Sequence, residues 1–186
     1  GASILWFAVN PMACVAALVG FFVYVVAYSL WFKRHSVWGT AIGGIAGAMP
    51  PVVGYLAVSS QFDLGALLVF AILFCWQIPH SYAIAIYRLD DYRAAAIPVL
   101  PLQCGLASTK RWMLVFVVAF AVVSLLPWFV GLASWMYGLV SLAVGLTWLW
   151  YSIQGFSADD NPRWARKMFL VSIIAINLIC LGFIIG

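Results

Sequence analysis

The sequence contains no glutamate, and charged residues of all kinds make up only 8% of its 186 residues. A typical soluble domain has about 25% charged residues, so this chain cannot cover a folded surface with polar groups. Hydrophobic residues make up 67% of the chain instead. We therefore expect an integral membrane protein, and this composition excludes soluble enzymes and nucleic-acid-binding proteins.

The four cysteines form no pattern typical of a disulfide framework or a zinc site. Cys14, Cys75, Cys104 and Cys180 lie far apart, without a C-x-x-C pair or a Cys/His ligand spacing, and we interpret them as thiols in the core. The chain begins with Gly1 and lacks the basic start and cleavage site of a signal peptide. We expect it to begin inside a longer protein.

The main feature of the sequence is a series of long apolar stretches. A helical span needs about 20 apolar residues, and the absence of strict alternation favours helices over barrel strands. The predicted spans are residues 11–32, 38–58, 64–87, 112–131, 134–156 and 165–185. We predict an all-α fold, a polytopic transmembrane helical bundle in one domain, with residues 1–8 as the stub of an earlier span.

All nine lysine and arginine residues fall in alternate loops between these spans. The first, third and fifth loops contain them, whereas the second loop offers only Asp63 and the fourth has no charge. Lysine and arginine near span ends accumulate on the cytoplasmic side. The basic loops are therefore predicted to be cytoplasmic, and charged chemistry is expected on that face.

The segment from Trp76 to Pro101 carries the most polar residues near a span. Pro79 removes a backbone hydrogen bond and is expected to kink the helix beside His80. If the helix continues beyond the kink, His80, Tyr87 and Asp91 fall on one stripe. A histidine inside a span is a candidate for a substrate contact, and a hydrogen bond that holds neighbouring helices together is an equal alternative.

Asp90 and Asp91 follow this span at the basic face. Mg²⁺ is usually bound through one or two carboxylates plus substrate phosphates, and Lys33, Arg34 and Arg88 are basic residues that can hold phosphate oxygens. The combination predicts a diphosphate ligand. Surface ion pairs for the aspartates, and ordinary positive-inside topology for the basic residues, are the alternatives.

Aromatic and small residues indicate how an apolar ligand would be enclosed. Four aromatic residues lie deep in the spans or near His80 and can stabilise a cation or line an isoprenoid slot: Tyr24, Tyr28, Trp76 and Tyr82. Core packing is the alternative for each of them. Glycines recur at every fourth position from residue 39 to residue 47. This spacing predicts close helix packing first and cavity lining second.

Two long runs resemble the protohaem IX farnesyltransferase family, also called haem O synthases, a branch of the UbiA-type intramembrane prenyltransferases. The runs are YSLWFKRHSVWGTAIGGIAGAMPPVVGY (28–55) and WQIPHSYAIAIYRLDDYRAAAIPVLP (76–101), and the similarity continues through WARKMF (164–169). It covers essentially the whole chain.

The resemblance implies transfer of a farnesyl group from farnesyl diphosphate to a vinyl group of haem b, which gives haem O and diphosphate in a bacterial inner membrane. It implies Mg²⁺ held by cytoplasmic aspartates, and a terminal oxidase or haem A synthase as further partners. We predict Asp91 and His80 as catalytic residues and Asp90 and Asp91 as metal ligands. The predicted substrate-binding residues are Lys33, Arg34, Arg88, Tyr28, Tyr82, Tyr87 and Tyr92.

One departure from the family pattern is large, because the family's first aspartate motif, N-x-x-x-D-x-x-x-D, is absent. We expect the chain to be a C-terminal fragment that is inactive alone. A prenyltransferase with another acceptor, such as a quinone precursor or chlorophyllide, and a membrane transporter component remain alternatives.

Overall fold

The computed structural model describes residues 1–185, and within them every regular element is a helix. The elements are α1 (Ala2–Ile4), η1 (Leu5–Val9), α2 (Pro11–Phe22), η2 (Val23–Phe32), α3 (Lys33–His35), α4 (Gly39–Ser59), α5 (Leu64–Tyr87), α6 (Leu89–Ala94), α7 (Leu100–Gln103), α8 (Gly105–Phe129), α9 (Trp135–Gln154), η3 (Gly155–Ser157) and α10 (Asn161–Ile185).

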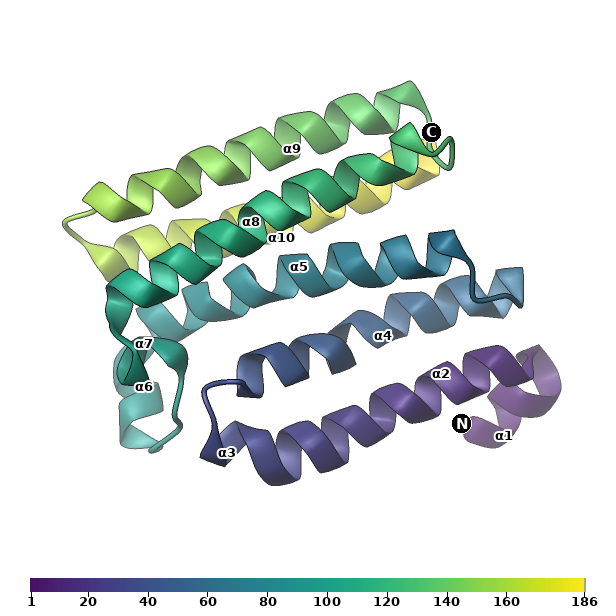
Figure 1. The fold of residues 1–186 in the computed structure, drawn as a ribbon, viewed down its shortest axis with the longest axis horizontal. Coiled ribbons are helices and arrows are strands. Elements are labelled where there is room, and N and C mark those ends of the chain that lie inside the picture. The colour runs from purple at the N-terminus through teal and green to yellow at the C-terminus, as the bar shows by residue number, and fades with distance from the viewer. Residues whose placement is uncertain (186) are drawn as a thin grey trace.

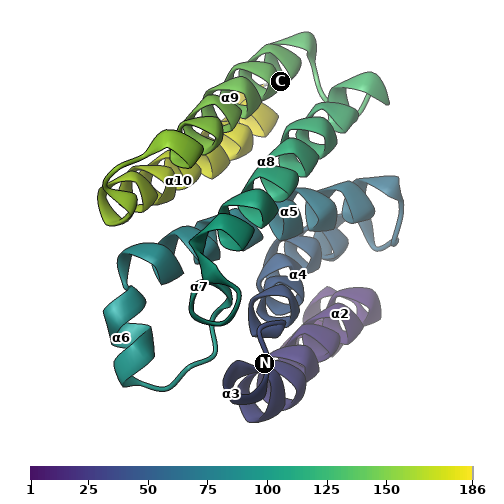
Figure 2. The same cartoon turned by 60° about the vertical axis from the view of Figure 1, so that its left-hand side comes forward.

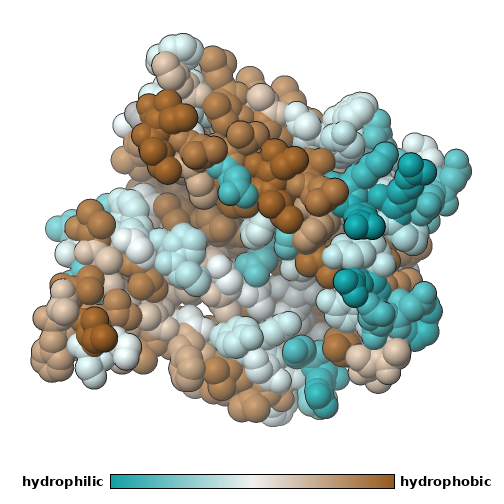
Figure 3. Space-filling view, turned by 180° about the vertical axis from the view of Figure 1, so that it is seen from behind, coloured by the Kyte–Doolittle hydropathy of each residue, from teal (hydrophilic) through white to brown (hydrophobic). Residues whose placement is uncertain are grey.

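Six helices are long and apolar enough to cross a membrane, which confirms the predicted fold class. The first of them runs without a break from Pro11 to His35 through α2, η2 and α3. The long helices lie side by side along the longest axis of the molecule (Figure 1). In Figure 3, hydrophilic residues gather at the end that carries the loops before α4, between α5 and α8, and before α10. We call this the basic end.

Helix α5 is the central element because it packs against α4, α8 and α10. A larger core fills the space between α5, α8, α9 and α10, with Phe120, Tyr137 and Trp148 fully buried. A smaller core joins α2, α4 and the start of α5 through residues such as Ala13, Val52 and Ala66. The bundle therefore has two halves that share α5 (Figures 1 and 2).

The fourth span begins earlier than the sequence indicated, at Gly105 instead of residue 112. The charge of Lys110 predicts a loop position, but Lys110 is buried inside α8. Its Nζ donates a hydrogen bond to the carbonyl of Gly155 at 2.5 Å and lies 5.2 Å from the centroid of the Trp164 ring. These contacts satisfy the ammonium group, so the helix can extend past it.

Polar caps fix where α2 and α5 begin. The Asn10 side chain accepts a hydrogen bond from the Ala13 N–H and donates one to the Leu56 carbonyl, which ties α2 to α4. At α5, the Asp63 carboxylate accepts hydrogen bonds from the Ala66 N–H and the Tyr55 hydroxyl. These bonds satisfy backbone groups that a helix end leaves unpaired.

The Asp63 cap predicts a pH-dependent stability. The Ala66 N–H, and after it the Tyr55 hydroxyl, hold the pKa of Asp63 below its ordinary value of 3.8. The carboxylate therefore stabilises the fold above that value, and this contribution is lost as the pH falls through the lowered pKa. Asp63→Ala should lower the thermal midpoint measured by circular dichroism in detergent, by a margin that shrinks below pH 3.8. Asp63→Asn keeps a capping side chain and should retain most of the stability at neutral pH. An Asp63→Ala deficit that stays constant with pH would contradict this role.

Candidate functional site

A cavity of about 970 Å³ lies between the helix Pro11–His35, α4 and α5. Tyr92 in α6 and residues 97–99 in the segment that follows α6 close it at the basic end. Its polar lining residues are Tyr24, Tyr28, Lys33, Ser36, Thr40, Gln77, Ser81 and Tyr92, and its apolar walls include Ala17, Phe21, Met49, Val53, Ile84 and Ile97. The cavity follows the first long helix from Ala17 to Lys33. It is long, apolar along most of its length, and polar near the basic end.

Glycines in α4 make room for two of the polar side chains. A Cβ atom at Gly43 would meet the Tyr28 ring at 3.1 Å, and one at Gly47 would overlap the Gln77 amide. Gly39, Gly43 and Gly47 also line the cavity. These glycines therefore allow close helix packing and also line the cavity. From the sequence, packing was the preferred interpretation and cavity lining the second.

The helix that carries Tyr24, Tyr28 and Lys33 is widened over Val23–Phe32 into a π-helix. The Lys33 N–H bonds to the carbonyl of Tyr28, five residues earlier. In an α-helix of 3.6 residues per turn, Lys33 would lie two and a half turns from Tyr24, on the opposite side. The i→i+5 hydrogen bonds of a π-helix put more residues into each turn, so Lys33 lies less than two and a half turns from Tyr24. The wider helix therefore brings Lys33 to the same face as the two tyrosines.

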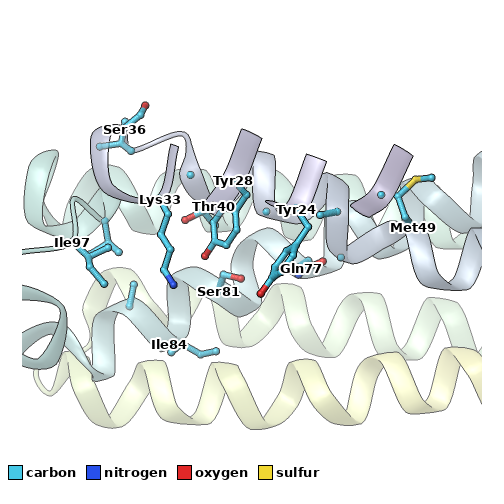
Figure 4. A pocket seen from close by; sticks show the side chains of 18 of the residues that line it. Tyr24, Tyr28, Lys33, Ser36, Thr40, Met49, Gln77, Ser81, Ile84 and Ile97 are labelled. Carbon is cyan, nitrogen blue, oxygen red and sulfur yellow. The ribbon is translucent and has the colours of Figure 1, made fainter. Parts of the chain in front are cut away.

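Lys33 points into the cavity, beside Tyr28 and opposite Ser81 and Ile84 (Figure 4). Its Nζ lies 5.9 Å from the centroid of the Tyr28 ring, and it has no salt-bridge partner within residues 1–185. Among the lining residues that the structure describes, Lys33 alone carries a charge. Hydroxyl groups from Tyr24, Tyr28 and Ser81 face the same space (Figure 4). This end of the cavity suits an anionic group, and the deeper part suits an apolar chain.

Of the residues predicted from sequence, Tyr28, Lys33 and Tyr92 line this cavity. Burial in this lining raises the pKa of the Tyr92 hydroxyl above its ordinary value, so it is a hydrogen-bond donor near neutral pH. The remaining predicted residues are not among those that line the cavity: Arg34, His80, Tyr82, Tyr87, Arg88, Asp90 and Asp91.

The predicted stripe from His80 to Asp91 is wrong, because α5 ends at Tyr87. Arg88 leaves helical geometry, and α6 turns away from the α5 axis (Figure 2). Asp91 accepts a hydrogen bond from Arg88 at 3.0 Å, and Asp90 pairs with Arg93 at 2.5 Å. The hydrogen bond to Asp91 raises the pKa of the Arg88 guanidinium. Both carboxylates are exposed, at 91% for Asp90 and 67% for Asp91.

His80 lies on the side of α5 that faces α10. Its Nδ1 is 2.7 Å from the Ser172 hydroxyl, and its ring stacks on Trp76 with centroids 4.6 Å apart. Phe169 contacts the same ring, at a centroid distance of 4.9 Å. The structure therefore supports the helix-holding alternative for His80. Tyr87 also packs on Phe169, and Tyr82 is buried in the larger core.

Three cavity residues, Gln77, Ser81 and Thr40, were not predicted as site residues. Gln77, Ser81 and Ile84 recur at helical spacing, about a quarter of a turn around α5 from Trp76 and His80. The signal was present in the sequence, since Gln77 is a polar residue within a span. His80, next to Pro79, is an equally polar position in the same span, so the sequence does not indicate which of the two faces of α5 lines a cavity.

The described residues hold no group of three or more histidine, cysteine, aspartate or glutamate side chains that could bind a metal ion. The adjacent carboxylates of Asp90 and Asp91 are nevertheless hard oxygen donors of the kind that Mg²⁺ prefers. A divalent ion there would need further oxygen ligands, such as substrate phosphates. Tyr92, the next residue, lines the cavity, so these carboxylates lie near its polar end.

The sequence matches the UbiA prenyltransferase family over residues 1–174. It is 49% identical over 177 residues to the protoheme IX farnesyltransferases of Enterobacter sp. (strain 638) and Cronobacter sakazakii (strain ATCC BAA-894). These matches cover 95% of this chain and 60% of each relative, so the chain spans less than two thirds of their length. A solved structure of a digeranylgeranylglyceryl phosphate synthase superposes with a TM-score of 0.85 at 16% identity, over 98% of this chain and 64% of that one. This last likeness concerns the fold.

Because the π-helix turns Lys33 into the cavity, we expect Lys33 to contribute more to anion binding than the adjacent Arg34. Lys33→Gln should weaken the binding of inorganic pyrophosphate about tenfold or more, because it removes the charge inside the cavity. Arg34→Gln, which removes the same charge one residue away and outside the lining, should change the affinity by about twofold at most. Isothermal titration calorimetry in detergent measures both. Equal losses, or a larger loss for Arg34→Gln, would contradict the observed orientation of this helix.

Proposed function

The chain belongs to the UbiA prenyltransferase family, and on this premise we propose that the protein transfers a farnesyl group from farnesyl diphosphate to a vinyl group of haem b. The products are haem O and diphosphate. The single observation that carries this choice of substrates is the 49% identity to protoheme IX farnesyltransferases over 95% of the chain. Because those relatives extend beyond the matched region, the proposal concerns the protein at its full length.

The cavity supports the prenyl-donor half of this proposal. Lys33 offers one positive charge at the polar end, and the hydroxyls of Tyr28 and Ser81 offer hydrogen bonds to diphosphate oxygens. The farnesyl chain then lies along the apolar walls towards Met49 and Val53. Opposite properties at the two ends fix the direction in which the substrate binds.

The same walls favour an ionised transition state. As the bond between C1 and the diphosphate oxygen weakens, positive charge develops on the allylic carbon, and the aromatic side chains of Tyr24 and Tyr28 in the lining can stabilise it. Lys33 and the hydroxyl donors stabilise the leaving diphosphate. Apolar side chains exclude bulk water, which would otherwise hydrolyse the cation. The haem vinyl group attacks C1, and water adds to give the hydroxyethylfarnesyl group.

Asp90 and Asp91 are proposed as the carboxylates that hold Mg²⁺ on the diphosphate. Each now forms an exposed ion pair, Asp90 with Arg93 and Asp91 with Arg88, and because solvent screens such pairs strongly, a divalent ion and its diphosphate could displace them. When bound, the ion supplies positive charge to the diphosphate oxygens. The freed Arg88 guanidinium is then available for the same phosphate oxygens. Association with a terminal oxidase or haem A synthase stays a prediction from the resemblance.

The decisive assay supplies haem b, farnesyl diphosphate and Mg²⁺ to the full-length protein and identifies the product by mass spectrometry. We expect haem O, and Asp91→Ala should lower kcat/KM for farnesyl diphosphate about a hundredfold. Asp159→Ala removes an exposed aspartate at the same end, outside the cavity lining, and serves as the matched control. Unchanged activity in Asp91→Ala would refute its role, and a prenylated quinone precursor in place of haem O would refute the acceptor.

We also propose that the basic end faces the cytoplasm of a bacterial inner membrane. The nine basic residues lie in or next to α3, α6 and the starts of α8 and α10, and these parts of the chain share one end of the bundle (Figure 1). This supports the proposal because positively charged loops are retained in the cytoplasm.

Cys104 provides a test of this orientation, since it is exposed between α7 and α8 at the basic end. Cys14 and Cys75 are buried, whereas Cys104 and Cys180 are exposed, so the interpretation of these last two as core thiols is wrong. Cys180 lies within the last span. A membrane-impermeant maleimide should label the protein in inverted membrane vesicles and leave it unlabelled in intact spheroplasts. Cys104→Ser should abolish the labelling. Labelling from the outside of spheroplasts would reverse the proposed orientation.

A further inference from the structure

A second cavity, of about 530 Å³, lies far along the chain from the first, at the basic ends of α9 and α10. Its lining includes Tyr151 and Gln154 from α9, Ser157 from η3, and Asp160, Arg163 and Lys167 around the start of α10. None of these residues takes part in the site described above. We propose that this cavity binds the phosphate headgroup of an anionic phospholipid, whose acyl chains lie along the outer faces of α9 and α10.

The charges of the lining favour an anion. Arg163 and Lys167 are four residues apart, so they project from the same face of α10. Both are exposed, and neither forms a salt bridge within residues 1–185. The Asp160 carboxylate opposes them, but it accepts a hydrogen bond from the Arg163 backbone N–H at 2.9 Å and so caps α10. The third nearby cation, Lys110, already donates to the Gly155 carbonyl. Two side-chain cations therefore remain for a phosphate group.

The depth of the cavity matches the headgroup region of a bilayer. The fifth span ends at Ser157 and the sixth begins at Asn161, so the lining residues lie where the hydrocarbon layer ends. Basic pockets between transmembrane helices on the cytoplasmic side are typical binding sites for anionic lipid headgroups. The volume also falls within the range of about 300–1,000 Å³ that is usual for small-ligand sites.

The surface below the cavity is apolar, which separates a lipid from a soluble anion. On α10, Leu170 and Ile174 follow Arg163 and Lys167 on the same helical face and are 51% and 59% exposed. On α9, Trp150 lies one turn deeper than Gln154 and is 56% exposed. A free phosphate would use only the cations. A phospholipid would use both the cations and this apolar strip, so the surroundings fit a lipid better.

The test compares Arg163 and Lys167 with Arg166, which is exposed on the same helix but is absent from the lining. The full-length protein in mild detergent is titrated with phosphatidylglycerol or phosphatidylcholine, and bound lipid is measured by native mass spectrometry. Arg163→Gln combined with Lys167→Gln should weaken phosphatidylglycerol binding about tenfold or more. Arg166→Gln should change it by about twofold at most, and phosphatidylcholine should bind weakly to every variant.

Two outcomes would overturn the proposal. Equal losses in Arg166→Gln and in the double variant would mean diffuse attraction to a basic surface. Displacement of phosphatidylglycerol by an equal concentration of inorganic phosphate would mean a site for free anions.

The unmodified protein offers a second measurement, since a phosphatidylglycerol with a photoactivatable acyl chain should label Trp150, Leu170 or Ile174. Labelling confined to the opposite half of the bundle, on α2 or α4, would contradict the location.

Discussion

The site depends on one backbone feature, the widening of the first long helix into a π-helix over Val23–Phe32. This widening turns Lys33 towards Tyr24 and Tyr28, and so puts a positive charge into a cavity whose other walls are uncharged in the described chain. Gly43 in α4 accepts the Tyr28 ring and leaves space for it. Helix geometry and glycine packing together give the cavity one positively charged end and one apolar end, and these properties suit the prenyl diphosphate that we propose as its ligand.

One face of helix α5 lines the cavity, and the other packs into the larger core. Gln77 and Ser81 face the cavity, whereas Trp76 and His80 face α10 and bond to the backbone and hydroxyl of Ser172. Polar groups within a membrane need hydrogen-bond partners inside the protein. Trp76 and His80 have theirs on Ser172, whereas Gln77 and Ser81 face the cavity, where a ligand can supply them. The larger core of α5, α8, α9 and α10 thereby holds α5 rigid while its other face lines the cavity.

Much of this organisation could be predicted from the sequence. The lengths of the apolar stretches indicated the number of spans. The alternation of basic and uncharged loops indicated that the basic residues lie at one end of the bundle, and the glycine spacing in α4 indicated close packing. Local signals failed where hydrogen bonding decided the geometry. No propensity distinguishes the π-helix at Val23–Phe32 from an α-helix, the end of α5 at Tyr87 depends on the turn through Arg88, and the burial of Lys110 depends on the distant Gly155 carbonyl.

Direct observation of a bound donor would test the role of the cavity most sharply. A cryo-electron microscopy map of the full-length protein with a non-reactive thio analogue of farnesyl diphosphate should show the diphosphate about 3 Å from the Lys33 Nζ. Its prenyl chain should run past Tyr24 and Tyr28 towards Met49. A diphosphate bound on the α10 side of α5, beside His80, or held by Arg34 with Lys33 turned outward, would contradict the proposed site.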